Sequence, residues 1–322
     1  MKILTAHFIA TDPENADNFG AIEKKQEEEE ISFSGGILGP AQIRQLATKL
    51  GVKPTKTRGQ NFVHDAGTVR RIVRDSGVQA KDAVLEIGPG LGSLTLALLE
   101  TGAYVSAIEI DSLLAGQISQ TVAKCLPKTE KNFSVQLMDA LAITGVEDFA
   151  VPAAYPEEKY FPTKLVANLP YNVAVPIILT LLEAVPSIAD FTVMVQMEVA
   201  DRLAAKPGSR TYGVPSVKAN WYGQVWRGAK ISRNIFWPIP NVDSALVHFS
   251  RHKQPSEVNR ENVFAVIDAA FAQRRKTLRA ALSDWAGSAM KAEEILTQAG
   301  IDPKRRGETL TIEEFVEIAR NV

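Results

Sequence analysis

The stretch Val84-Leu-Glu-Ile-Gly-Pro-Gly-Leu-Gly92, continued by Ser93-Leu-Thr-Leu-Ala-Leu-Leu-Glu100, decides the fold. Its apolar beginning has the length of a buried strand, its glycines mark a tight turn, and the residues from Ser93 onward have the composition of a helix. Because glycine has no Cβ, the backbone of such a turn can approach a bound ligand closely. The stretch therefore predicts a ligand-binding strand-turn-helix unit of an α/β protein.

The segments around this unit repeat its pattern of strand and helix. We expect further strands at Tyr104–Ile108, Phe133–Leu137, Lys164–Ala167 and Thr192–Gln196, and helices at Ala66–Ser76, Leu113–Lys124 and Pro176–Ala184. Strands that alternate with helices in this way form a mostly parallel, doubly wound sheet. The fold class predicted for this part is therefore α/β.

The later part of the chain changes in character twice. Residues Trp221–Phe249 are rich in aromatic and β-branched side chains with prolines between them, which predicts antiparallel strands at the edge of the sheet. We then expect only helices, at Glu261–Gln273, Thr277–Trp285, Ala292–Ala299 and Ile312–Arg320. The last of these begins at Thr311 with Glu314 three residues on, the pattern of a capping box. A small all-helical domain is thus predicted to close the chain.

Charge divides the chain unevenly. Residues 1–37 hold three basic and eight acidic groups, while the chain as a whole has 36 basic and 37 acidic groups. We therefore predict an acidic N-terminal extension at 1–37, a main domain at 38–252 and the helical domain at 253–322.

Several classes of protein are excluded by composition. The chain has no apolar run long enough to cross a membrane, and its single cysteine, Cys125, cannot form an internal disulfide. The four histidines show no metal-ligand spacing, so we expect no metal. The prediction is a cytoplasmic protein.

An acidic residue about twenty positions after the glycine turn strengthens the prediction of ligand binding. Glu109 follows the second strand, where a carboxylate can accept the two hydroxyls of a ribose. The turn has Gly88, Gly90 and Gly92 in the order Gly-x-Gly-x-Gly and is preceded by Glu86. A dinucleotide site would have Gly-x-Gly-x-x-Gly, so this spacing favours a ligand without phosphate, and a nucleotide-dependent oxidoreductase stays as an alternative.

Two polar positions follow later strands. Asp139 closes the third strand, where it can accept a hydrogen bond from the amine of an adenine or simply cap a helix. Asn168-Leu-Pro-Tyr171 closes the strand Lys164–Ala167 and is the most specific signal in the chain. An exocyclic adenine amine is a poor nucleophile, because its lone pair is delocalised into the ring. The Asn168 side-chain oxygen and the Leu169 carbonyl, held by Pro170, can accept both amine hydrogens, and Tyr171 can stack on the base.

These motifs resemble a known family. The resemblance runs from about residue 38 to the end and rests on Gln60-Asn-Phe62, Glu86-Ile-Gly-Pro-Gly-Leu-Gly92, Glu109-Ile-Asp111, Asn168-Leu-Pro-Tyr171, Phe236-Trp-Pro-Ile-Pro240, Val242-Asp-Ser244, Gln273-Arg-Arg-Lys-Thr277 and Gly300-Ile-Asp-Pro303. Together they are similar to the small-subunit ribosomal RNA adenine dimethyltransferases, the KsgA/RsmA family. The related resistance methylases of large-subunit RNA share the catalytic motifs but are less similar in the helical part.

The resemblance implies a Rossmann-like class I methyltransferase that uses S-adenosylmethionine and releases S-adenosylhomocysteine. It implies that two adjacent adenosines, in a hairpin near the 3′ end of 16S rRNA in the immature small subunit, each receive two methyls. The donor site implied by the motifs comprises Asn61, Val63, Gly88, Gly90, Glu109, Asp139 and Asn168. The catalytic segment implied is Asn168, Leu169, Pro170 and Tyr171, with Phe236 as a second aromatic wall for an extruded adenine; a plain core role for Phe236 stays open. We expect a monomer.

Three departures from the family pattern stand out: Val63 replaces a more usual leucine, the acidic extension is additional, and the loop 140–163 is longer than usual.

RNA contact is predicted for two basic groups. They are Lys53, Lys56, Arg58, Arg70, Arg71 and Arg74 in the first part, and Arg274, Arg275, Lys276 and Arg279 in the helical part. Solvated helix faces would have the same composition. A large-subunit methylase and an assembly factor that acts mainly by binding remain as further hypotheses.

Overall fold

The computed structural model describes residues 33, 35–52, 61–254 and 258–322. Predictions that concern residues 1–32, Lys53, Lys56 and Arg58 lie outside this part of the chain. The residues from Phe33 to Val322 form one compact unit.

A seven-stranded sheet organises this unit in the order β4-β3-β2-β5-β6-β9-β7. Its strands are β2 (Ala83–Ile87), β3 (Tyr104–Glu109), β4 (Phe133–Leu137), β5 (Lys164–Asn168), β6 (Asp190–Gln196), β7 (Gly223–Ile231) and β9 (Ser244–Arg251). The first five pair in parallel, and β9 and β7 add antiparallel strands at one edge. This is the mostly parallel, doubly wound arrangement with antiparallel edge strands that the sequence predicts. A separate two-stranded sheet joins β1 (Phe62–Val63) to β8 (Phe236–Trp237).

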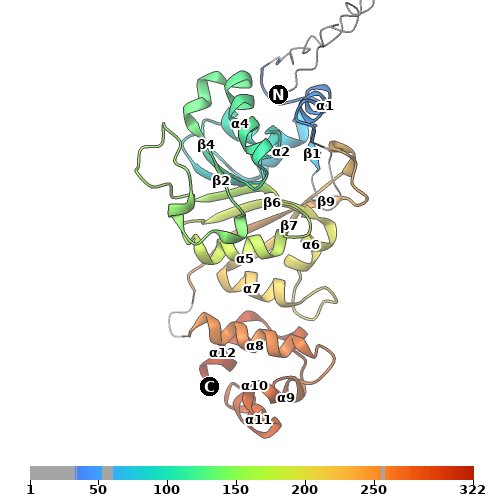
Figure 1. Ribbon diagram of the computed structural model, residues 1–322. Helices are drawn as coiled ribbons and strands as arrows, with labels where there is room; N and C mark the ends of the chain where they lie inside the picture. The colour runs from blue at the N-terminus through green and yellow to red at the C-terminus, as the bar shows by residue number, and fades with distance from the viewer. Residues whose placement is uncertain (1–32, 34, 53–60, 255–257) are drawn as a thin grey trace, which may run out of the picture. The chain divides into compact units, whose positions relative to one another are not determined.

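Helices cover both faces of the large sheet (Figure 1). Those that accompany it are α1 (Pro40–Lys49), α2 (Ala66–Asp75), α3 (Ser93–Glu100), α4 (Ser112–Cys125), α5 (Ala174–Ala184), α6 (Met197–Leu203) and α7 (Val214–Tyr222). Short 3-10 helices lie at η3 (Pro127–Asn132), η4 (Ala140–Ala142), η5 (Val146–Asp148) and η6 (Arg233–Ile235). In Figure 1, α2 and α4 lie on one side of the sheet, and α5 and α7 lie on the other.

The main core lies between the sheet and α5 and α7. Its strand residues come from alternate positions, such as Leu165 and Ala167 of β5, and the intervening Val166 is buried as well, because parallel strands in the middle of a sheet are covered on both faces. The long loop 140–163 belongs to this core through Tyr160, whose buried hydroxyl donates to the carbonyl oxygens of Val84 at 2.8 Å and Tyr104 at 2.7 Å. The loop therefore covers the amino end of the sheet beside β2 and β3.

Two predictions of secondary structure in this part need correction. The sequence pattern does not predict helices α6 and α7, and Trp221, which it places in the strand region, is in the last turn of α7. Pro215 in the first turn starts this helix, since its fixed φ suits that position. The buried side chains of Val217 and Trp221 then follow at helical spacing.

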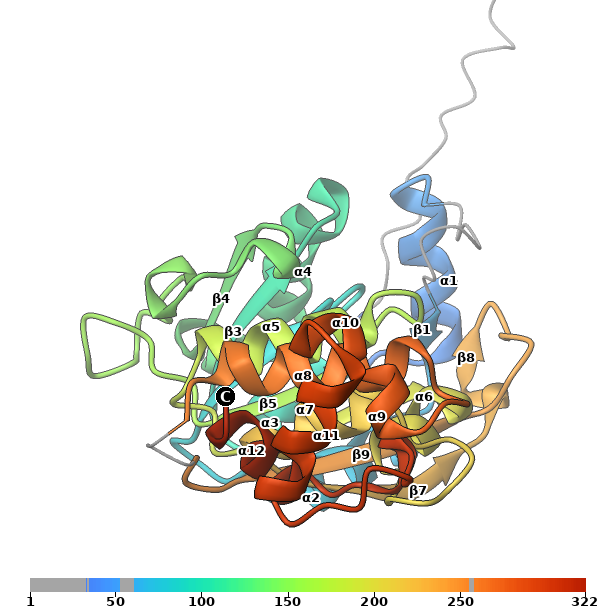
Figure 2. The ribbon, with the colours of Figure 1, turned by 90° about the horizontal axis from the view of Figure 1, so that it is seen from below.

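The C-terminal residues form helices, as predicted. They are α8 (Arg260–Ala272), α9 (Leu278–Ala281), α10 (Ser283–Ala286), α11 (Ala289–Gln298) and α12 (Ile312–Arg320), with the 3-10 helix η7 (Gly307–Thr309) before the last; Figure 2 shows them gathered in one group. The predicted helix Thr277–Trp285 is divided at Leu282, where the Ser283 hydroxyl donates back to the Ala280 carbonyl and competes with the helical pattern. The capping box is confirmed: the Thr311 amide donates to Glu314 Oε2 at 2.8 Å, and the Glu314 amide donates to Thr311 Oγ1 at 3.3 Å.

The helical group packs on the core through α7. The hydroxyl of Tyr212 donates to the Leu310 carbonyl at 2.8 Å, and Lys218 pairs with Asp268 at 2.8 Å. Trp221 also contacts the ring of Phe264 edge-on.

Candidate active site

A cavity of about 420 Å³ opens at the carboxyl ends of β2, β3 and β5. Strand β2 pairs with β3 on one side and with β5 on the other, so the order in which strands are added to the sheet changes side here. Open α/β sheets bind ligands at such a switch point, because the loops after the two strands diverge and leave a crevice. The lining includes three segments that the sequence predicts as functional, namely Asn61–Val63, Gly88–Gly92 and Asn168–Tyr171.

The glycine turn forms one wall of the cavity. Gly88, Gly90 and Gly92 have φ values of 68°, 57° and 103°, which lie in the left-handed region. A Cβ on Gly92 would lie 2.5 Å from Ile118 Cδ1, and one on Gly90 would lie 3.2 Å from the Phe62 ring. A Cβ on Gly88 would meet no atom within 4 Å, because this residue faces the open cavity. Gly92 is thus needed for packing, and Gly88 leaves space for a ligand.

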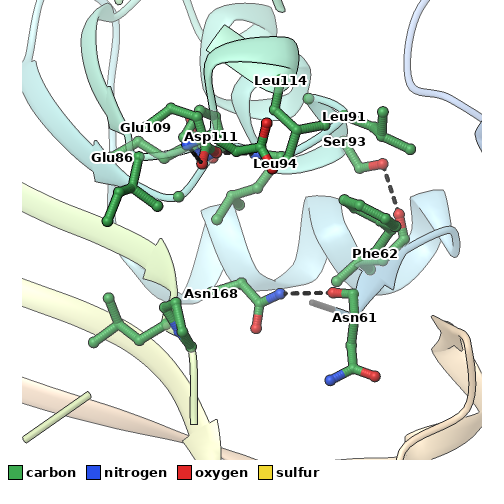
Figure 3. Close-up of a pocket in the computed structure, with 18 of the residues that line it drawn as sticks. Asn61, Phe62, Glu86, Leu91, Ser93, Leu94, Glu109, Asp111, Leu114 and Asn168 are labelled. Carbon is green, nitrogen blue, oxygen red and sulfur yellow. Dashed lines mark hydrogen bonds between the residues drawn. The ribbon is translucent and has the colours of Figure 1, made fainter. Parts of the chain in front are cut away.

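Glu109 is fixed by the turn that it faces. Its Oε2 accepts the Gly90 amide at 3.1 Å, and its Oε1 accepts the Asp111 amide at 3.0 Å (Figure 3). Burial raises the pKa of Glu109, and the hydrogen bonds from the Asp111 and Gly90 amides oppose that rise. The carboxylate is therefore oriented before any ligand arrives.

Glu86 is the most unusual polar group of the site. Its side chain lines the cavity and is 1% exposed, and its Oε2 has no hydrogen-bond partner among the described residues. Burial raises the pKa of Glu86 to about 8; the nearby Thr95 hydroxyl opposes this rise, and the neighbouring Glu109 carboxylate adds to it. A buried carboxyl oxygen without a partner is costly, so the position suits a ligand that brings a donor or a positive charge.

The segment Asn61–Val63, here called the strap, lines the cavity beside the glycine turn. Strand β1 pairs with β8, so that Phe62 lies opposite Trp237 and Val63 opposite Phe236. The Ser93 hydroxyl, at the start of α3, donates to the Val63 carbonyl at 2.6 Å (Figure 3). The strap is thus held from both sides.

The segment Asn168–Tyr171 leaves β5 at the cavity. The Asn168 Nδ2 donates to the Asn61 carbonyl at 3.2 Å (Figure 3). The Leu169 amide donates to the Met194 carbonyl at 3.0 Å, which ties the segment to β6. All four residues of the segment line the cavity. With Nδ2 engaged, Oδ1 of Asn168 is the atom available to accept a hydrogen bond from a ligand.

Two predicted site residues do not line this cavity. Phe236 is fully buried, pairs through its backbone with Val63 and is not part of the cavity lining. Its role as an aromatic wall and its role in the core both stay predictions. Asp139 is exposed and caps η4, with Oδ1 accepting the Leu141 amide at 2.9 Å. Asp139 nevertheless follows a strand that is next to the site, since Leu137 at the end of β4 lies opposite Glu109.

The predicted basic residues divide into paired and unpaired ones. Arg70 binds Glu100 with two nitrogens at 2.8 and 2.7 Å, Arg274 pairs with Glu308 at 2.7 Å and Arg279 with Glu293 at 2.6 Å. Arg71 lies 3.6 Å from Asp75. Arg74, Arg275 and Lys276 are exposed and have no ion pair within the described ranges.

The structure adds basic residues that sequence reasoning missed. The Arg274 guanidinium donates to the Arg210 carbonyl at 2.8 Å, and the Gly208 amide donates to the Glu308 carbonyl at 2.7 Å. These contacts bring three loops together, and their exposed cations are Lys206, Arg210, Arg275, Lys276, Lys304 and Arg306. The dipeptide Lys304-Arg305 next to Gly300–Pro303 was a visible signal, whereas the approach of Lys206 and Arg210 depends on tertiary contacts.

Two further properties concern the described residues only. They contain no group of three or more His, Cys, Asp and Glu side chains that could hold a metal ion. None of the helices in this part of the chain is long and apolar enough to cross a membrane.

Comparison with known proteins agrees with this geometry. Residues 52–321 match the family model described as ribosomal RNA adenine dimethylase. A protein of Streptomyces avermitilis called ribosomal RNA small subunit methyltransferase A is 58% identical over 88% of this chain and 94% of its own length. A protein of Thermobifida fusca with the same name is 55% identical over 91% of this chain and 99% of its own length.

Solved structures share the fold. A dimethyladenosine transferase from Plasmodium falciparum is 23% identical, covers 80% of this chain and 95% of its own, and superposes with a TM-score of 0.65. The 23S rRNA methyltransferase ErmE is 25% identical, covers 81% of this chain and 99% of its own, and has a TM-score of 0.59. Together with the cavity and its motifs, these matches identify the chain as a member of the ribosomal RNA adenine dimethylase family, S-adenosylmethionine-dependent enzymes that methylate adenines of ribosomal RNA.

Proposed function

We propose that this protein dimethylates two adjacent adenosines in a hairpin near the 3′ end of 16S rRNA, within the immature small subunit. The observation that carries the proposal is the presence of Asn168–Tyr171 in the same cavity as the glycine turn and Glu109. The small subunit is supported by relatives of that name with 55–58% identity across about nine tenths of the chain. We further propose that the protein acts as a cytoplasmic monomer.

The cavity fits S-adenosylmethionine. Its volume of about 420 Å³ lies within the range of roughly 300–1,000 Å³ that is common for small-molecule sites. The unpartnered Glu86 oxygen suits a ligand with an ammonium and a sulfonium group, and the open space at Gly88 suits close approach of the ligand to the backbone. When bound, this cofactor supplies an electrophilic methyl group on a positively charged sulfur.

Each part of the lining has a proposed role toward the donor. Asn61 and Val63 of the strap would hold its methionine end, Gly88 and Gly90 its middle, and Glu109 its ribose hydroxyls. Asp139 would contact its adenine, which requires the exposed side chain to turn toward the cavity from the η4 cap.

The acceptor side is proposed for Asn168–Tyr171. The Asn168 Oδ1 and the Leu169 carbonyl would accept the two hydrogens of the adenine amine, which restores the nitrogen lone pair for attack. Tyr171 would stack on the extruded base and hold it in line with the methyl group. No side chain needs to act as a nucleophile, because binding and orientation supply most of the catalysis.

RNA binding is proposed for the helical part, residues 253–322, together with α2. Arg74, Arg275 and Lys276 are the strongest candidates among the predicted residues, because no acidic side chain among the described residues neutralises them. Lys206, Arg210, Lys304 and Arg306 extend the surface at Arg275 and Lys276. Arg70, Arg274 and Arg279 would have to exchange their carboxylate partners for phosphates.

The test offers labelled methyl donor to small subunits and large subunits that lack these modifications, followed by mapping of the modified base. We expect label on two adjacent adenosines of 16S rRNA, up to two methyls on each. Label in 23S rRNA would instead favour the large-subunit alternative, to which ErmE is a structural relative. Tight binding to small subunits without any label would favour an assembly factor.

A further inference from the structure

A buried hydroxyl lies behind the proposed substrate side of the cavity. Ser244, fully buried at the start of β9, is hydrogen-bonded through Oγ to the hydroxyl of Tyr171 at 3.0 Å. The two residues are 73 positions apart. Ser244 does not line the cavity, whereas Tyr171 does. We propose that Ser244 is a positioning residue that holds the ring of Tyr171 in place for the target adenine.

The backbone of Ser244 is held on both sides. It lies opposite Gln196 of β6 and opposite Ile231 of β7. The preceding residue, Asp243, accepts the Met197 amide through its carbonyl and the Arg233 amide through Oδ1, and it pairs with Lys230 at 2.7 Å. A hydroxyl on such a backbone has little freedom to move, so it can hold a hydrogen-bond partner in a fixed position.

Tyr171 has no such support from its own backbone. It lies in the loop between β5 and α5, where the nearest turn contact runs from the Val173 amide to the Pro170 carbonyl at 3.3 Å. The loop is anchored at Asn168 by the bond to Asn61, which leaves the ring of Tyr171 to be fixed at its far end. A hydrogen bond at the hydroxyl fixes the far end of the ring and so restricts rotation about the Cα–Cβ bond. Because the phenol O–H prefers to lie in the ring plane, the same bond also favours one orientation of that plane.

The consequence for catalysis differs from that for donor binding. A ring held in one position presents its face to the incoming base, so the base is held in line with the donor and less orientation is lost in reaching the transition state. Ser244 does not touch the donor side of the cavity. Loss of its hydroxyl should therefore lower kcat for methyl transfer and leave the affinity for S-adenosylmethionine unchanged. This inference rests on the proposed stacking role of Tyr171.

A double-mutant cycle tests the inference on the full-length protein. The variants are Ser244→Ala, Tyr171→Phe and the double variant, assayed by single-turnover methyl transfer to unmodified small subunits. We expect each single change to lower kcat by about three- to tenfold, the value of one neutral hydrogen bond. The double variant should be no slower than either single variant, because both changes remove the same bond.

Controls separate positioning from folding. Ser106 is also a fully buried strand serine, and its hydroxyl donates to the Ala150 carbonyl at 2.7 Å, away from the cavity. Ser106→Ala should lower the melting temperature and leave kcat unchanged. Ser244→Thr keeps a hydroxyl and should restore much of the rate lost in Ser244→Ala. If Ser244→Ala lowers only the melting temperature, or if its loss of kcat adds fully to that of Tyr171→Phe, Ser244 does not act through Tyr171 and the inference is wrong.

Failure of the underlying function has a different signature. If Tyr171→Ala keeps the wild-type rate, the stacking role itself fails, and the Ser244 inference fails with it. If Tyr171→Ala abolishes transfer while Ser244→Ala and Tyr171→Phe are both as fast as the wild type, stacking stands and the positioning by Ser244 is rejected.

Discussion

The side-chain amide of Asn168 and the main-chain carbonyl of Asn61 are joined by a hydrogen bond of 3.2 Å across 107 residues of sequence. The bond connects the strap over the cavity to the segment that closes β5. It also determines the orientation of the Asn168 amide, because the nitrogen faces Asn61 and the oxygen remains for a ligand. The position of the strap and the chemistry of Asn168 are therefore coupled.

Replacement of Asn168 by alanine should abolish most of the methyl transfer. The variant loses the acceptor for the adenine amine and the bond to the strap, and we expect kcat to fall by about a hundredfold or more. Binding of S-adenosylmethionine should weaken by less, since Glu109 and the glycine turn are untouched. Single-turnover rates and calorimetric titration of the donor measure the two effects.

The matched control is Asn132→Ala. The Asn132 Nδ2 also donates to a backbone carbonyl, that of Ala103 at 3.4 Å, but it does not line the cavity. This variant should keep the wild-type kcat. A rate for Asn168→Ala within about threefold of the wild type would remove this residue from the proposed mechanism.

Glu86 should make stability depend on pH. The pKa of its carboxyl is raised in the folded state to about 8, from 4.5. The folded protein therefore holds this proton more tightly than the unfolded chain, so stability is fully present below about pH 4.5 and is lost as the pH rises through about 8. In Glu86→Gln this loss is absent. The variant should gain stability relative to the wild type, by up to roughly 4 kcal/mol, between these limits.

Melting curves at several pH values test this prediction without the donor. The affinity for the donor should also depend on pH, and only in the wild type. A cationic ligand favours the ionised carboxylate, so wild-type affinity should rise as the pH approaches 8, and that of Glu86→Gln should stay flat. Parallel pH profiles for the two proteins would mean that Glu86 does not titrate in this range.

The glycine turn gives a prediction that separates packing from binding. Gly88→Ala places a methyl in the open cavity, so we expect the dissociation constant of S-adenosylmethionine to rise at least about tenfold. Gly92→Ala places a methyl 2.5 Å from Ile118 Cδ1 in the core, and we expect a loss of about 1–3 kcal/mol of unfolding free energy. Donor titration and denaturant unfolding of both variants give the comparison.

The control for Gly88 is Gly77. It has a similar φ of 66°, and a Cβ added to it would also meet no atom within 4 Å, but it lies at the end of α2 and not on the cavity. Gly77→Ala should lower the unfolding free energy, because alanine is strained in the left-handed conformation, and should bind the donor normally. Equal donor affinity in Gly88→Ala and Gly77→Ala would show that Gly88 is not close to the ligand.

Local pattern was enough to find most of the fold. Strand β4 and helix α3 have the bounds that the sequence predicts, because hydrophobic period and glycine turns act within a few residues. The cavity-lining motifs were found for the same reason: three of them follow strands whose carboxyl ends meet at one edge.

Tertiary pairing determined what the sequence could not predict. The pairing of Phe62 with Trp237 and of Val63 with Phe236 joins distant segments, and the ring of Phe236 is fully buried. The ion pairs of Arg70 and Arg274 with Glu100 and Glu308 are equally non-local. A basic residue in the sequence therefore does not reveal whether its charge is free for phosphate.

That difference in pairing predicts which cations contribute to RNA affinity. Arg275→Gln and Lys276→Gln remove exposed charges without an ion pair among the described residues, so each should reduce the slope of log affinity against log salt by about 0.7 if it contacts a single-stranded phosphate. Arg70→Gln should reduce this slope less, because Arg70 must first leave two hydrogen bonds to Glu100.

Lys128→Gln is the control, since this exposed lysine lies in η3, before the amino end of β4 and so away from the cavity. Filter binding of unmodified small-subunit RNA over a salt series measures all four. An unchanged slope in Arg275→Gln and Lys276→Gln would exclude the turn after α8 from the RNA-binding surface, and an equal reduction in Lys128→Gln would show that only net charge matters.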